Sequence, residues 1–184
     1  VVNQIEQDQR LDKRKIALLG ISRAGKTPLW CGAKDERVSI VIAGVSGCGR
    51  ASRFRESKGE SIHQMTTNFP YWTCKNFTQY AGKEENLPID QHLLLALIAP
   101  RPLYLFEATN DNWCDAHNSF QAAVVASEVY QLFGKKGLGD KSFPKPNTPL
   151  LDGNIGYHIH EGEHGIFSYD WQQILTFLSK YFKD

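Results

Sequence analysis

The expected fold is decided by the stretch Ile16-Ala-Leu-Leu-Gly-Ile-Ser-Arg-Ala-Gly-Lys26. Four apolar residues lead into Gly20, and glycines stand on both sides of Ser22. An apolar run of this kind predicts a buried strand, and glycines permit a tight, closely packed turn. A helix-like segment follows the turn. The sequence therefore predicts a strand, a turn that carries Ser22, and a helix.

A strand, a serine turn and a helix in succession form the nucleophile elbow of α/β-hydrolases, which raises the serine hydroxyl above the edge of the sheet. The usual spacing of that motif is G-x-S-x-G, whereas here the second glycine, Gly25, comes one residue later. Any turn between a strand and a helix can contain glycine and serine. The stretch alone leaves both interpretations open, so the rest of the chain has to decide between them.

Composition narrows the class of protein. The chain has 184 residues, of which 41% are hydrophobic, and this is enough for one domain with a sizeable core. Its formal net charge is +1 and no long run of one sign occurs, so neither nucleic acid nor a membrane is an expected partner. No apolar stretch approaches the roughly 20 residues that span a bilayer. The cysteines contain no C-x-x-C pair and form no zinc pattern; they are Cys31, Cys48, Cys74 and Cys114.

The start of the chain suggests that part of a domain is missing. Residues 1–7 lack the basic start and apolar core of a signal peptide. The strand before the nucleophile is usually the fifth of this fold, yet here it begins near residue 15. We therefore expect residues 1–184 to be the C-terminal part of a single α/β-hydrolase catalytic domain. The missing N-terminal half would supply more of the sheet and one wall of the site.

Strand-like and helix-like segments alternate along the chain, which predicts a mostly parallel sheet with helices on both faces. The expected strands are residues 15–20, 38–43, 102–108 and 155–160. The expected helices are residues 2–9, 24–33, 91–98 and 119–133, followed by a closing helix capped by Asp170. The predicted buried face of that last helix contains Trp171, Ile174, Leu175, Phe177, Leu178, Tyr181 and Phe182. Residues 50–88 are irregular and rich in aromatic side chains, as expected of either a binding loop or a satellite core.

Three loops at the same edge of this sheet carry the residues of a serine hydrolase. Acyl transfer by serine needs a base for the hydroxyl proton, a carboxylate that orients the base, and donors for the oxyanion. In α/β-hydrolases the order along the chain is serine, acid, histidine, each after a strand. Ser22, Asp111 and His164 follow that order. Their agreement is more specific than any one of them and favours a serine hydrolase.

Some alternatives remain at this point. Asp115 competes with Asp111 for the acid role, although Asp111 lies closer to the end of its strand. His158 and His160 alternate on one strand face and, with His164, imitate a metal cluster. Without a carboxylate or cysteine at suitable spacing, we expect no metal, and we interpret His158 and His160 as wall or core residues.

With these residues identified, the sequence resembles the glucuronoyl esterases, family fifteen of the carbohydrate esterases, and is most similar to the bacterial type. The most specific match is Ser22-Arg-Ala-Gly-Lys26, which also explains the displaced glycine. The other matching stretches are Ser46–Gly49, Phe69–Trp72, Leu87–His92, Ala96–Pro102, Trp113 and Gly156–Ile159.

The resemblance implies hydrolysis of the ester between 4-O-methyl-glucuronic acid of glucuronoxylan and a lignin alcohol, without a cofactor and by a secreted or periplasmic enzyme. It implies Ser22 as nucleophile, His164 as base and then acid, and Asp111 as the residue that orients His164. Arg23 would complete the oxyanion hole through its backbone N–H and its guanidinium. The positions that bind the sugar in this family correspond here to Lys26, Glu60 and Trp113.

The sequence departs from the family at a second acid position. Some members carry the triad acid as a glutamate just before the Ser-Gly-x-Gly loop, and Val45 stands there in this chain. An apolar side chain cannot orient a histidine, so Asp111 has to provide the carboxylate. Two other functions remain open: an esterase of different specificity, such as an acetylxylan esterase, and a carbohydrate-binding relative with a broken triad.

Overall fold

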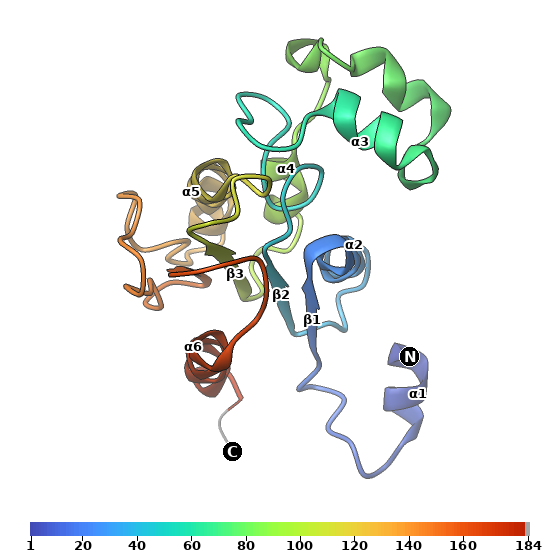
Figure 1. The fold of residues 1–184 in the computed structure, drawn as a ribbon. Helices are drawn as coiled ribbons and strands as arrows, with labels where there is room; N and C mark the ends of the chain where they lie inside the picture. Colours follow the sequence, from blue (N-terminus) through green and yellow to red (C-terminus); the bar gives the residue numbers. More distant parts are fainter. Residues whose placement is uncertain (183–184) are drawn as a thin grey trace.

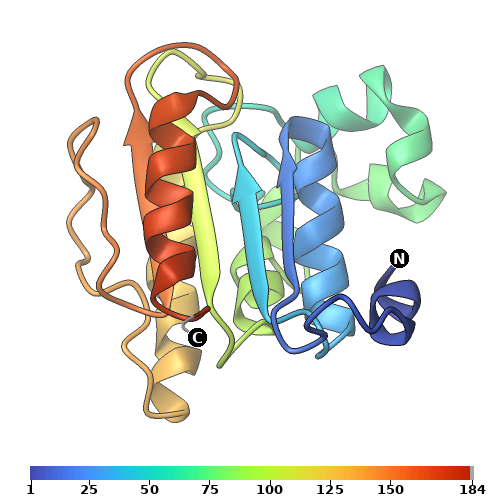
Figure 2. The ribbon, with the colours of Figure 1, turned by 90° about the horizontal axis from the view of Figure 1, so that it is seen from below.

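A single parallel sheet organises the chain. The computed structural model describes residues 1–182, and its strands follow the order β1-β2-β3-β4, each parallel to the next. Their bounds are β1 Ala17–Ile21, β2 Ile40–Gly44, β3 Leu103–Ala108 and β4 Ile155–His160. The parallel sheet that the sequence predicts is confirmed, and all four C-terminal ends meet at one edge (Figures 1 and 2).

Helices cover both faces of the sheet because the strands are apolar on both sides (Figure 2). The helices that cover the sheet are α2 Lys26–Lys34, α4 Gln91–Ala96, α5 Ala116–Leu132 and α6 Ser168–Ser179. One core joins α2, α4 and α5 to one face, with Val41 and Leu105 at its centre. The other core joins α6 to Ile42, Tyr104 and Phe106 on the opposite face. The predicted two-faced arrangement is therefore confirmed.

Three helix starts differ from the sequence expectation, and the first is α2, which begins at Lys26 rather than at residue 24. Helix α5 begins at Ala116 because Asp115 caps it, accepting a hydrogen bond from the Asn118 N–H at 3.1 Å. Helix α6 begins at Ser168, so Asp170 lies inside its first turn; the Asp170 carboxylate still accepts the Phe167 N–H at 2.7 Å. An aspartate can thus cap a helix from the residue before it, as Asp115 does, or from its first turn, as Asp170 does. The sequence pattern alone does not distinguish these two positions.

The buried stripe predicted for the last helix is partly wrong. Ile174 and Phe177 are buried as expected, but Trp171 is 45% exposed and Leu175 is 59% exposed. Leu178, Tyr181 and Phe182 are partly buried against the second core, as expected. Trp171 and Leu175 lie outside that contact.

The part of the aromatic segment 50–88 that spans residues 62–86 stands apart from the sheet (Figure 1), whereas Ala51 lies in the first core. It contains a short helix, α3 Ile62–Asn68, and three 3-10 turns, η2 Pro70–Trp72, η3 Lys75–Tyr80 and η4 Glu84–Asn86. The rings of Phe69 and Trp72 stack with centroids 3.9 Å apart, whereas Tyr71 is exposed. A small satellite packing unit therefore forms, and Trp72 on it faces the main body through contacts described below.

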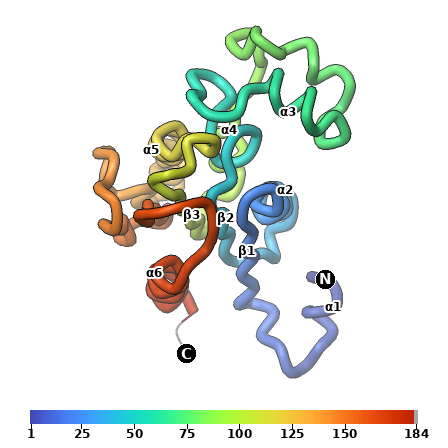
Figure 3. Tube along the Cα trace, viewed as in Figure 1, coloured from blue at the N-terminus to red at the C-terminus, as the bar shows by residue number. Residues whose placement is uncertain are grey.

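The periphery of the fold consists of an outer strand, the N-terminal helix and a long loop. Strand β1 is an outer strand of the sheet, and its Leu19 is exposed. The N-terminal helix α1 Val2–Gln7 and the loop 135–154 lie at opposite sides of the fold (Figure 3). Within residues 1–182, no helix combines the length and apolar character that crossing a membrane requires.

The central core gives a direct test of this packing. Leu105 is fully buried on β3, whereas Leu132 at the end of α5 is 85% exposed. We expect Leu105→Ala to lower the free energy of unfolding by about 2–5 kcal/mol, because it removes packed methyl groups and leaves a cavity. Leu132→Ala is the control, with an expected change within about 0.5 kcal/mol. Denaturant unfolding measures both, and equal effects would contradict this core.

Candidate active site

The Ser22 turn has the strained backbone of an elbow. Ser22 directly follows β1 and opens a 3-10 turn, Ser22–Gly25, with a φ of 54°. A left-handed φ is uncommon for a residue with a side chain and persists where the surrounding structure requires it. The strain fits a serine that has to leave its strand abruptly and point above the sheet edge.

The two glycines beside Ser22 are required by close packing. A Cβ on Gly20 would lie 2.3 Å from the Ala24 carbonyl oxygen, inside the turn itself. A Cβ on Gly25 would lie 2.7 Å from the Ser46 Cβ, on the loop after β2. The displaced second glycine therefore lets the start of the helix approach the neighbouring loop, which explains its position physically.

Asp111 and His164 form a closely bonded pair. Asp111 follows β3 and His164 follows β4, and Asp111 Oδ2 lies 2.5 Å from His164 Nδ1. The Asp111 side chain is 5% exposed, whereas that of His164 is 44% exposed. The other carboxylate oxygen of Asp111 accepts the Cys114 N–H at 3.2 Å. One ring nitrogen of His164 is thus held by a buried carboxylate, and the side chain remains accessible.

Ser22 lies at the same edge of the sheet without a bond to this pair. Within residues 1–182, no hydrogen bond joins Ser22 to His164. Ser22 and His164 follow the two outer strands, but the loop 161–167 runs from β4 back across the sheet edge before it enters α6 (Figures 1 and 3). Catalytic hydrogen bonds are commonly long in ligand-free enzymes, so this geometry is compatible with a serine and a base that meet on substrate binding.

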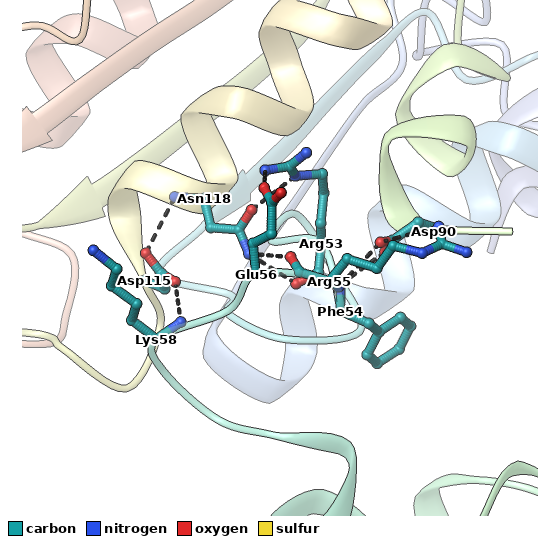
Figure 4. Close-up of polar contacts among 8 residues, drawn as sticks. All are labelled: Arg53, Phe54, Arg55, Glu56, Lys58, Asp90, Asp115 and Asn118. Carbon is teal, nitrogen blue, oxygen red and sulfur yellow. Dashed lines mark hydrogen bonds and ion pairs between the residues drawn. The ribbon is translucent and has the colours of Figure 1, made fainter. Parts of the chain in front are cut away.

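Asp115 has a different task from Asp111. Its carboxylate caps α5 and also accepts the Lys58 N–H at 2.6 Å (Figure 4). The two aspartates therefore have different contacts: Asp111 is bonded to His164, and Asp115 anchors the loop that precedes α3.

The whole segment 53–58 is fastened to the starts of two helices (Figure 4). The Asp90 carboxylate accepts the Phe54 N–H at 2.7 Å, the Arg55 N–H at 3.1 Å and the Gln91 N–H at 2.8 Å. Arg53 Nε donates to Asn118 Oδ1 at 2.8 Å. The segment continues to Glu60, whose N–H donates to the Trp113 carbonyl at 3.0 Å. These bonds bring Glu60 and Trp113 together from distant parts of the sequence.

Charged side chains converge around Trp72, next to the Ser22 turn. Lys26 Nζ lies 4.3 Å from the Trp72 ring centre, and the Arg50 guanidinium lies 5.2 Å from it. Burial lowers the pKa of Lys26 to about 8, with a further lowering by Arg50 and an opposing effect of Glu60. Burial raises the pKa of the Glu60 carboxyl, against the effect of Arg50 and Lys26. The site thus combines two cations with one carboxylate.

This cluster adds two residues to those singled out in the sequence. These residues are Arg50 and Trp72, and the sequence alone assigned a role to neither of them. Arg50 is buried, donates to the Ser46 carbonyl, and has no partner for its Nε atom within the described part of the chain. Glu60 Oε1 is also buried and has no hydrogen-bond partner among the described residues. The Phe-Pro-Tyr-Trp match was the only sequence signal for Trp72.

Val45 closes the floor below the Asp111–His164 pair. It is buried with Ala108 and Cys114, and its carbonyl accepts the Cys114 thiol at 3.1 Å. Burial raises the pKa of the Cys114 thiol, followed by the effect of Glu107, so this thiol stays protonated at neutral pH. The apolar residue at the second acid position thus has a packing role and leaves Asp111 as the carboxylate that contacts His164.

The structure changes the argument about metal ligands. Asp170 lies between His158 and His160, so the expectation that no carboxylate joins these histidines is wrong. However, Asp170 Oδ1 is 2.7 Å from His158 Nε2 and 2.8 Å from His160 Nδ1, which are hydrogen-bond lengths. Ligands held at zinc bond lengths around a tetrahedron would be about 3.3 Å apart. His164 is not part of this group, because its Nδ1 atom is bonded to Asp111.

Sequence comparison identifies similar proteins. The model of the family described as "Glucuronyl esterase, fungi" matches residues 1–134. Carbohydrate esterase MZ0003, from an unknown prokaryotic organism, is 45% identical over 96% of this chain and 40% of its own length. The 4-O-methyl-glucuronoyl methylesterase of Schizophyllum commune is 33% identical over 73% of this chain and 36% of its own length.

Solved structures give the same result for the fold. A promiscuous CE15 esterase from a marine bacterial metagenome is 44% identical, with a TM-score of 0.94 over 97% of this chain and 45% of its own. A glucuronoyl esterase from Solibacter usitatus is 39% identical, with a TM-score of 0.93 over 99% of this chain and 46% of its own. The α/β-hydrolase fold expected from the sequence is confirmed. The chain spans less than half the length of these relatives.

The charge cluster allows a test that needs no substrate. Glu60 raises the pKa of Lys26, so Glu60→Gln should lower that pKa below its value of about 8. A titration of the Lys26 side-chain carbon signals by NMR measures the shift. Glu56→Gln is the matched control, because Glu56 is largely exposed and pairs with Arg53. A Lys26 pKa that responds equally to both substitutions would contradict the arrangement.

Proposed function

The chain belongs to the glucuronyl esterase family, and from this membership we propose that it is the part of a serine esterase that cleaves esters of 4-O-methyl-glucuronic acid. The proposed substrate is the ester that links this sugar, on glucuronoxylan, to a lignin alcohol. The observation that carries the proposal is the Asp111–His164 pair on the sheet edge that also bears the strained Ser22 turn. An acetylxylan esterase and a non-catalytic binding protein are not favoured.

In the proposed reaction, Ser22 Oγ attacks the uronate carbonyl carbon while His164 Nε2 takes the hydroxyl proton. Asp111 fixes the tautomer of His164, because its Oδ2 accepts the Nδ1–H. The tetrahedral intermediate then collapses, the alcohol leaves with the proton from His164, and an ester forms at Ser22. Water attacks this acyl-enzyme in the same way, with His164 again as base, and releases the free uronic acid.

The oxyanion of each intermediate needs donors that are already in place. Arg23 follows Ser22 in the 3-10 turn, and its guanidinium has solvent access. We assign the Arg23 N–H and guanidinium to the oxyanion hole. A charged donor stabilises developing negative charge more strongly than an amide does.

The sugar is proposed to lie between Lys26, Glu60 and Trp113. Glu60 contacts Trp113 through its backbone N–H, and Lys26 reaches the same region over Trp72. Cation and carboxylate can bridge neighbouring hydroxyls, and the exposed Trp113 indole offers a face to a pyranose ring. No cofactor or metal enters this reaction scheme.

Two further proposals concern the complete protein. A polymeric substrate implies action outside the cytoplasm, by secretion or in the periplasm. We also propose that an additional half-domain pairs with β1, which has an open edge and an exposed Leu19. Covering an open strand edge is the usual way to protect it from unwanted association. The length of the relatives supports this proposal.

The acid role is tested by a pair of substitutions in the complete gene product. Asp111→Ala should lower kcat for the methyl ester of 4-O-methyl-glucuronic acid by about 10⁴-fold, as for other triad acids, because His164 loses its orientation. Asp115→Ala should instead lower stability by about 0.5–2 kcal/mol through the lost helix cap. Unchanged turnover in Asp111→Ala would show that another residue is the acid.

Sugar recognition is tested by comparing two substrates. Trp113→Ala should raise KM for the glucuronate methyl ester, because the ring loses its stacking surface, and leave KM for 4-nitrophenyl acetate nearly unchanged. Trp30→Ala, an exposed tryptophan on the outside of α2, is the matched control. Acetate hydrolysis without glucuronate hydrolysis in the unsubstituted protein would contradict the proposed substrate.

A further inference from the structure

A continuous chain of buried hydrogen bonds lies beneath the loop that carries His164. The Tyr104 hydroxyl is 2.6 Å from His158 Nδ1, and His158 Nε2 is 2.7 Å from Asp170 Oδ1. His160 Nδ1 is 2.8 Å from the same Asp170 oxygen, and His160 Nε2 is 2.9 Å from the Glu163 carbonyl. All four residues are at most 2% exposed. The proposed reaction uses none of them.

The partners of His160 determine its protonation state. A backbone carbonyl can only accept, so His160 Nε2 has to carry a hydrogen toward Glu163. Asp170 also accepts the Phe167 N–H on its other oxygen at 2.7 Å. Burial acts to raise the pKa of Asp170, but the bonds from His158 and Phe167 bring it below its ordinary value. Asp170 is therefore an acceptor, and His160 Nδ1 has to carry a hydrogen as well.

His158 differs from His160 because one of its partners can donate. The Tyr104 hydroxyl donates to His158 Nδ1, and His158 Nε2–H donates to Asp170. Burial lowers the pKa of His158, which agrees with a neutral ring. One positive and one negative charge then balance inside the fold. The other aromatic neighbours, Tyr169 on α6 and the Phe167 ring, carry no charge at neutral pH.

We propose that His160 is a buried imidazolium paired with the Asp170 carboxylate, and that this pair positions the catalytic loop 161–167. His160 holds the Glu163 carbonyl, directly before His164, and Asp170 holds the Phe167 N–H at the far end of the loop. On the outer side, Asn110 is bonded to Gly162 and to the Glu163 carboxylate. His160 and Asp170 are therefore positioning residues, and this role rests on the proposed function.

A neutral His160 could keep only one of its two bonds as a donor. Loss of the bond to the Glu163 carbonyl would leave this partly buried pair without its hydrogen bond and release the loop next to His164. A displacement of the base by about 1 Å can cost about 100-fold in rate. The expected consequence is a fall in kcat for every ester, without a matching change in KM.

The protonation state is tested first, on the unsubstituted complete gene product with ¹⁵N-labelled histidine. NMR at pH 7 should show both ring nitrogens of His160 protonated, and only Nε2 of His158. Signals are assigned from single histidine substitutions. A His160 ring with one ring-nitrogen proton overturns the inference. Binding of added zinc by His158 and His160, seen as a shift of their ring-nitrogen signals, also overturns it.

The positioning role is tested with two variants and a control. His160→Leu removes both donors, whereas His160→Gln keeps an N–H for the Glu163 carbonyl. We expect kcat to fall by about 10–100-fold in His160→Leu and less in His160→Gln, with KM within about twofold in both. Amide hydrogen exchange in the loop 161–167 should accelerate in the same order. His63→Gln, on the exposed face of α3, should change neither quantity.

The outcomes separate this inference from the proposed function. A protein without glucuronate esterase activity whose His160 carries two ring protons, and whose loop loosens in His160→Leu, would contradict the proposed function but keep the structural pair. An active esterase in which His160→Leu leaves kcat and loop exchange unchanged would overturn the positioning role.

Discussion

The hydrogen bond between Asp111 and His164 is the interaction on which the site depends, because it joins the loops after the two last strands of the sheet. The parallel registers of β3 and β4 bring both loops to one edge. Val45 and Cys114 form an apolar floor beneath the pair. From the other side, the bonds of His160 and Asp170 fix the loop that carries His164. The position of His164 is therefore fixed from both sides.

A cluster of charged side chains lies beside the Ser22 turn. Lys26 and Arg50 face Glu60 around the Trp72 ring, in a region where burial lowers the pKa of Lys26 and raises that of Glu60. Unpaired charges in such a place are costly unless a polar ligand completes their hydrogen bonds. Arg50 Nε and Glu60 Oε1 are both buried without a partner in the described part of the chain. These two groups are therefore available to hydrogen-bond a polar ligand.

Local sequence patterns were sufficient to predict the strands and the parallel sheet. The strand 155–160 was predicted with its observed bounds, and the turn at Ser22 followed from apolar residues and glycines. Long-range contacts escaped prediction. Nothing in the spacing of Asp170 shows that it reaches between His158 and His160, because the strand and the helix meet only through packing. Likewise, Asp111 and Asp115 lie in the same loop, and the sequence does not show which of them contacts His164. The structure shows that Asp115 caps α5 and that Asp111 is bonded to His164.

The central claim is that Ser22 is the nucleophile of an α/β-hydrolase site, and covalent trapping tests it most directly. The complete gene product would be treated with a fluorophosphonate, which reacts with activated serines, and digested for peptide mapping by mass spectrometry. The account predicts one phosphonate adduct, on Ser22, that is absent after prior substitution of His164 by alanine. An adduct on another residue, or no adduct in a folded protein, would contradict it.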